Sequence, residues 1–147
     1  MDGELYIVNV EAFVYHWGRY LMIVRGPTEE IAPGTLTPPG GKVEVSGLVQ
    51  DVLEETLRRE VREEAGIEVE DGMLYVESHS FDGGGQRIID LVFLACYRSG
   101  EPAALDAEEV AGLEWLTYDQ VMHDPRAMAW TRESLRRAES VRKERGW

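Results

Sequence analysis

Apolar residues gather in short runs along much of this chain, in a pattern typical of β-strands. Runs rich in Val, Ile, Phe and Tyr at 5–15 and 20–24 predict one β-hairpin. The runs at 73–81 and 87–97 flank a Gly-rich segment and predict a second hairpin. A further short strand is expected at 113–116. The strand pattern therefore occurs both early and late in the chain, with a gap between the two hairpins.

A helical pattern fills part of that gap. Four apolar residues recur at intervals of four and form one stripe: Leu53, Leu57, Val61 and Ala65. Gly66 is the expected C-terminal cap of this helix. At the other end, Asp51 and Glu54 have the spacing of a capping box, although a start one turn earlier, near Gly47, is also compatible with the sequence.

The remaining segments complete an α+β pattern. Residues 25–41 contain four prolines and four glycines and predict a loop, with room for a short strand at 36–37. Thr117 is expected to cap a brief helix that reaches Met122, and residues 127–144 predict a terminal helix. No internal repeat or linker divides the chain. We expect one domain over residues 1–147, with a mixed β-sheet flanked by helices.

The distribution of charge excludes several partners. The chain has 15 Lys and Arg against 28 Asp and Glu, a formal charge of −13. Residues 1–124 hold 8 basic and 25 acidic side chains, whereas residues 125–147 hold 7 basic and 3 acidic ones. A surface for duplex nucleic acid or an anionic membrane needs many Lys and Arg, which the first segment lacks. A carboxylate excess can instead bind a hard cation such as Mg²⁺.

The sequence also bears on the compartment. Cys96 is the only cysteine, so an intrachain disulfide and a cysteine-rich zinc site are excluded. The first residues show no basic segment followed by a long apolar one, and no run approaches the length of a membrane span. We expect a cytoplasmic protein.

Three carboxylates share one face of the predicted helix. Glu60 and Glu64 lie one turn apart, and Glu63 lies beside both. Like charges at this spacing destabilise an isolated helix, so the face is either simply solvated or compensated by a cation. The Gly40-Gly41 turn ahead of the helix favours a cation, because glycine lets backbone carbonyls approach an ion closely. These oxygens predict a Mg²⁺ site.

The two segments together resemble the Nudix hydrolase box. Gly-Gly-Lys-x-Glu at 40–44 is followed by Arg-Glu-Val-x-Glu-Glu-x-Gly-Ile at 59–67, which matches the second half of the box at every fixed position. The first half departs from the family pattern. Asp51 stands where the box has Glu, and Gly41 precedes Arg59 by 18 residues rather than 14. This implies a four-residue insertion within 45–50, as an added helical turn or as a bulged loop.

The resemblance implies a fold and an activity. The fold is the Nudix α/β/α sandwich, and the activity is metal-dependent hydrolysis of a nucleoside diphosphate linked to another group. The signatures of the ADP-ribose, diadenosine-polyphosphate and coenzyme A subgroups are absent, and residues 77–90 contain neither Pro nor Tyr. A MutT-like pyrophosphohydrolase of (d)NTPs or modified nucleotides is therefore expected. The alternative is a catalytically silent Nudix module that senses or binds a nucleotide.

The same resemblance implies roles for individual residues. Glu64 and the Gly40 carbonyl would bind Mg²⁺, or Mn²⁺ in its place. Glu60 would be a metal ligand or the general base, and Glu63 would complete the cluster. Arg59 would orient a carboxylate.

Some assignments are left open. In MutT-like members, a further metal-site glutamate lies six residues before a late tryptophan. Counting back from Trp115 gives Glu109, with Glu108 as its rival. No residue is assigned to the base or sugar of the substrate. The basic terminal helix is expected to be a solvated face, and its Trp130 and Leu135 either dock the helix or pair two copies in a homodimer.

Overall fold

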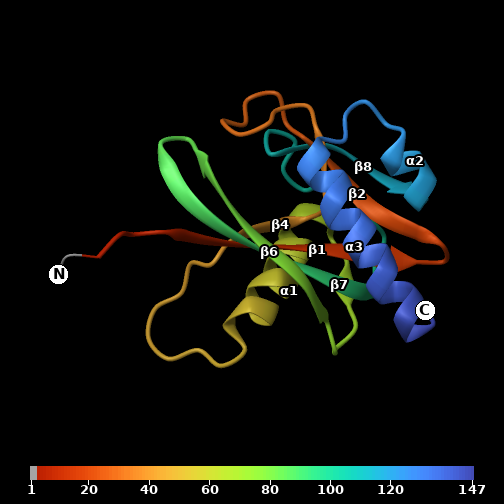
Figure 1. Cartoon of the computed structure of the whole chain (residues 1–147), viewed down its shortest axis with the longest axis horizontal. Coiled ribbons are helices and arrows are strands. Elements are labelled where there is room, and N and C mark those ends of the chain that lie inside the picture. Colours follow the sequence, from red (N-terminus) through yellow and green to blue (C-terminus); the bar gives the residue numbers. More distant parts are fainter. Residues whose placement is uncertain (1–2) are drawn as a thin grey trace.

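The strands form one mixed sheet with helices on both faces (Figure 1), in a computed structural model that describes residues 3–147. This matches the expected α+β architecture. The elements in chain order are β1 (Ile7–His16), β2 (Arg19–Arg25), β3 (Leu36–Thr37), β4 (Gly40–Lys42), α1 (Val52–Ala65), β5 (Glu68–Val69), β6 (Leu74–Gly83), β7 (Gln86–Ser99), β8 (Val110–Leu116), α2 (Tyr118–Met122) and α3 (Ala129–Arg145).

A parallel pair, β1 and β7, forms the centre of the sheet. The main order of strands is β3-β2-β1-β7-β5, and β4, β6 and β8 pair with β1, β7 and β2 respectively. The parallel register runs from Ile7 opposite Ile88 to Tyr15 opposite Cys96. All other pairings are antiparallel. Both predicted hairpins are present, with turns at 17–18 and 84–85.

The two faces of the sheet bury separate apolar clusters. On one face, Leu57 and Val61 of α1 are fully buried in clusters with alternate residues of β1. On the other face, Leu135 of α3 is fully buried in a cluster with Phe13 and Tyr20. Leu135 therefore docks α3 against the sheet, while Trp130 is half exposed. Within residues 3–147, no helix has both the length and the apolar composition needed to span a bilayer.

The start of α1 agrees with the sequence expectation that Asp51 is the residue directly before the helix. The helix begins at Val52, so the earlier start near Gly47 is wrong, and residues 43–51 form a loop rather than an added turn. The capping box is wrong as well. Asp51 has a left-handed backbone with φ 52°, and its side chain makes no cap hydrogen bond. The C-terminal cap is confirmed, because Gly66 has φ 71° and its N–H donates to the Arg62 carbonyl.

The short helix α2 does have the expected cap. The Gln120 N–H donates to Thr117 Oγ1 at 3.2 Å, and the Thr117 N–H donates to Gln120 Oε1 at 2.8 Å. We expect Thr117→Ala to lower the free energy of unfolding by about 1 kcal/mol. Asp51→Gly is the matched comparison, because glycine adopts a positive φ freely and no cap bond is lost. Urea denaturation should therefore show a lower free energy of unfolding for Thr117→Ala but not for Asp51→Gly. Equal decreases in the two variants would contradict the assignment of the caps.

The terminal helix starts later than the pattern suggests. It begins at Ala129 rather than 127, because the preceding backbone is held by strand-like contacts. The Leu36 N–H donates to the Arg126 carbonyl, and Leu36 forms an isolated β-bridge with Ala127.

The basic side chains of this region are largely paired with acids. Arg126 binds both Glu114 and Asp124. Arg136 and Arg137 pair with Glu133, Arg137 also pairs with Glu77, and Arg142 pairs with Glu139.

Candidate active site

Strand β4 brings the glycine turn against α1. The Gly40 N–H donates to Glu64 Oε1 at 2.8 Å, which joins positions 24 residues apart. Gly40 reaches this place because β4 pairs with β1, with Gly40 opposite Glu11. A side chain at position 40 has no room, since a Cβ would lie 2.2 Å from the Val10 carbonyl oxygen. In this structure Gly40 contacts Glu64 through its backbone N–H group and not through its carbonyl.

Glu60 lies over the second glycine of the turn. A Cβ on Gly41 would come within 2.3 Å of the Glu60 carboxyl carbon. Arg59 Nη2 donates to Glu60 Oε1 at 3.0 Å and to the Lys42 carbonyl at 3.2 Å. Arg59 therefore ties the Glu60 carboxylate to β4. Glu63 is more exposed, and its Oε1 lies 4.0 Å from Arg59 Nε.

The loop before β8 brings one of the two candidate glutamates close to this cluster. The backbone of this loop packs on Gly26, and the Gly26 N–H donates to the Glu109 carbonyl at 2.9 Å. The negative charge of Glu109 raises the pKa of both Glu60 and Glu64. Glu108 belongs instead to a local turn, in which its N–H donates to Asp106 Oδ1. Of the two candidates, Glu109 is thus the one whose charge acts on the carboxylates of α1.

The carboxyls of Glu60, Glu64 and Glu109 hold their protons more tightly than free glutamate, because burial raises the pKa of each. Burial raises the pKa of Glu64 to about 8, and the charges of Glu60 and Glu109 add to this, although the hydrogen bond from Gly40 opposes it. Burial also raises the pKa of Glu60, against the effect of Arg59. Neighbouring carboxyls with raised pKa values are short of positive charge, which a divalent cation would supply.

This burial predicts a pH dependence of stability in protein freed of divalent cations. The Glu64 carboxyl binds its proton more tightly in the folded state than in the unfolded state, so its contribution to stability falls as the pH rises from about 4.5 to about 8. Glu64→Gln lacks this carboxyl and should show a shallower loss. Denaturant unfolding in a chelator at several pH values measures the difference. A difference that does not change with pH would contradict the burial of Glu64.

Two residues near the site were missed from the sequence. Glu11 lies opposite Gly40 on β1. Burial raises the pKa of both Glu64 and Glu109, and the positive charge of Arg25 opposes part of that rise. The Arg25 guanidinium is held by the Ile31 carbonyl at 2.8 Å and by Glu29 at 3.1 Å. In the sequence, Glu11 stands out only because it is the single charged residue within the apolar run 5–15.

Comparisons with known proteins identify the family and the fold of the chain. A family model described as NUDIX domain matches residues 6–138. A MutT NUDIX hydrolase from Burkholderia pseudomallei is 28% identical, with a TM-score of 0.75, covering 91% of this chain and 98% of that one. The MutT protein from Methanosarcina mazei Go1 is 24% identical, with a TM-score of 0.78 and coverage of 94% and 96%.

A third structure shows the same fold with a ligand. The NUDIX domain of Shewanella oneidensis NrtR, complexed with ADP ribose, is 18% identical, with a TM-score of 0.69 and coverage of 97% of this chain and 90% of that one. A comparison with curated proteins finds no match.

Proposed function

Because the chain belongs to the NUDIX family and is a NUDIX pyrophosphohydrolase, we propose that it hydrolyses a (d)NTP or a modified nucleotide at a diphosphate bond. One observation carries this proposal: the Gly40 N–H group holds Glu64 beside Glu60, at a turn where only glycine fits. The expected site residues Glu60, Glu64 and Glu109 thus lie within electrostatic reach of one another.

The donor set suits a hard divalent cation. The proposed ligands are the Gly40 carbonyl and the carboxylates of Glu60, Glu63, Glu64 and Glu109. Each of these groups offers an oxygen atom, which is the ligand that Mg²⁺ prefers. The raised pKa values of Glu60 and Glu64 support the fit, since a cation would stabilise their charged forms. When bound, Mg²⁺ or Mn²⁺ would neutralise phosphate charge and lower the pKa of a coordinated water.

The side chains then have separate tasks in the proposed reaction. A water oxygen attacks a phosphorus of the diphosphate, and the bond from that phosphorus to the bridging oxygen breaks. Glu60 serves as a ligand or takes the proton of the water. Arg59 orients Glu60 through the 3.0 Å hydrogen bond. The Gly40 N–H group holds Glu64 in place, and Glu63 completes the acidic face.

The substrate in this proposal is a small nucleotide rather than duplex nucleic acid or a membrane. The acidic body of residues 1–124 and the absence of subgroup signatures from the sequence support this choice. We place the enzyme in the cytoplasm, where its only cysteine, Cys96, would stay a free thiol.

A hydrolysis screen tests the proposal. The panel contains (d)NTPs, oxidised nucleotides, nucleotide sugars including ADP-ribose, and dinucleoside polyphosphates, each with Mg²⁺ or Mn²⁺. We expect turnover of a triphosphate to the monophosphate and pyrophosphate, and complete loss of turnover with excess chelator. Turnover of ADP-ribose alone would replace the proposed substrate class. Nucleotide binding without any turnover would support the silent binding module instead.

A further inference from the structure

A second cluster of metal-ligating side chains lies on the strands of the sheet and contains none of the carboxylates of α1. Glu11, His79 and Asp90 come from the neighbouring strands β1, β6 and β7, and one ligand atom of each lies within 4.8 Å of the other two. His79 Nε2 lies 3.3 Å from Asp90 Oδ2. Asp90 is only 3% exposed, and Asn9 Nδ2 donates to its other carboxylate oxygen at 2.7 Å.

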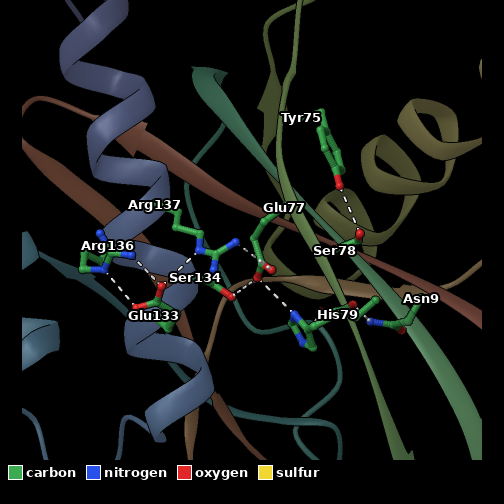
Figure 2. A network of polar contacts seen from close by, with 10 residues as sticks. Asn9, Tyr75, Glu77, Ser78, His79, Glu133, Ser134, Arg136 and Arg137 are labelled. Carbon is green, nitrogen blue, oxygen red and sulfur yellow. Dashed lines mark hydrogen bonds and ion pairs between the residues drawn. The ribbon is translucent and has the colours of Figure 1, made fainter.

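The imidazole of His79 is oriented by residues behind it. Figure 2 shows Glu77 between His79 on β6 and the two α3 residues Ser134 and Arg137. Glu77 Oε1 lies 3.0 Å from His79 Nδ1 and accepts from Ser134 Oγ at 2.6 Å. With Nδ1–H donating to Glu77, Nε2 is the nitrogen that carries the free lone pair, and it lies 3.3 Å from Asp90 Oδ2. A carboxylate behind a histidine in this way is the usual support of a metal-binding imidazole.

Glu11 provides an independent observation. Among residues 3–147, no hydrogen-bond donor or ion-pair partner contacts its carboxylate, and its near neighbour is the carboxylate of Asp90. Apart from the His79 imidazole beside Asp90, no cationic side chain among residues 3–147 contacts these two adjoining carboxyls, so a bound cation would compensate their charge.

We propose that Glu11, His79 and Asp90 bind a divalent cation of the Zn²⁺ or Mn²⁺ class. One imidazole nitrogen with two carboxylate oxygens suits these ions, whereas Mg²⁺ prefers oxygen ligands alone. The three strands hold the ligands within the sheet, and Glu77 and Asn9 support them from behind. The site is separate from the glutamates of α1, although Glu11 lies opposite Gly40 in the β1·β4 pair.

Zn²⁺ binding without nucleotide tests this inference independently of the hydrolytic function. Equilibrium dialysis should show that Glu64→Gln keeps one Zn²⁺ equivalent, which His79→Gln and Asp90→Asn lose. Glu77→Gln, which removes only support, should weaken that equivalent by about 10-fold to 100-fold. His123→Gln is the matched control, because His123 is exposed and lies in α2's C-terminal cap.

Two results would overturn the proposal. One is unchanged Zn²⁺ binding by folded His79→Gln, as judged by circular dichroism and thermal unfolding. The other does not depend on any variant: crystals of the wild-type protein soaked in Zn²⁺ should give an anomalous peak between Glu11, His79 and Asp90. Failure to see that peak would mean that the two carboxyls share a proton and bind no metal.

Discussion

Glu64→Gln is expected to lower kcat by about 10³-fold and, in metal-free protein at neutral pH, to raise the free energy of unfolding, because glutamine does not have to take up a proton on folding. Glutamine keeps the shape of the side chain and an oxygen that can accept from the Gly40 N–H group, but it cannot carry a negative charge. In metal-free protein, burial holds the pKa of Glu64 near 8, so the neutral amide resembles the protonated carboxyl already present. The variant should therefore fold normally and fail at cation binding.

Steady-state kinetics on the substrate found in the screen, together with urea denaturation, measure both quantities. Glu55→Gln is the control, because it makes the same change on the same helix at an exposed carboxylate that pairs with Arg58. It should keep full activity. If Glu64→Gln turned over substrate at the wild-type rate, the metal site would be wrongly placed.

Gly40→Ala is expected to destabilise the fold by about 3 kcal/mol. Its Cβ would lie 2.2 Å from the Val10 carbonyl oxygen and 2.7 Å from the Glu11 Cα atom, both of them backbone atoms of the central strand β1. Neither atom can move without disturbing the pairing of β1 with β4. Because no side-chain rotation can relieve the clash, the backbone of the sheet must shift to accommodate the added Cβ.

Gly41→Ala is the matched variant, because the added Cβ would meet the flexible end of Glu60 instead of backbone. Glu60 can rotate away, which should spare stability but reduce kcat by about 10-fold or more as the carboxylate leaves its place. Urea denaturation and kcat, measured on both variants, separate the two effects. Equal stability of the two variants would contradict the close packing of Gly40 on β1.

The apolar pattern predicts both hairpins and the central helix because these depend on local periodicity. The helical spacing of four between Glu60 and Glu64 likewise places both carboxylates on one face without knowledge of the fold. Strand β4 could not be predicted, since Gly-Gly-Lys has no strand pattern. It is a strand because the flanking Val43 N–H donates to the Val8 carbonyl, a contact that only the folded chain supplies.

The same limit applies to the site. A count back from Trp115 gives Glu109 with Glu108 as its rival, and only the folded loop shows that the charge of Glu109 acts on Glu60 and Glu64. The capping box at Asp51 had the right residues in the right spacing, but the loop before α1 enters the helix through a left-handed residue, which leaves the side chain without its bond. The cluster of Glu11, His79 and Asp90 depends on strand pairing that the sequence does not show.

The parallel pairing of β1 with β7 also bears on how fast the chain folds. Asn9 and Asp90, which are hydrogen-bonded across this pair, are 81 residues apart in the sequence. A long segment must therefore be closed into a loop before the central pair forms, and the entropic cost of that closure precedes the contacts that repay it. Both hairpins and α1 can form earlier from local contacts. We therefore expect refolding to have a slow main phase in which the sheet centre is completed, so that the ability to bind divalent cations returns later than helical structure.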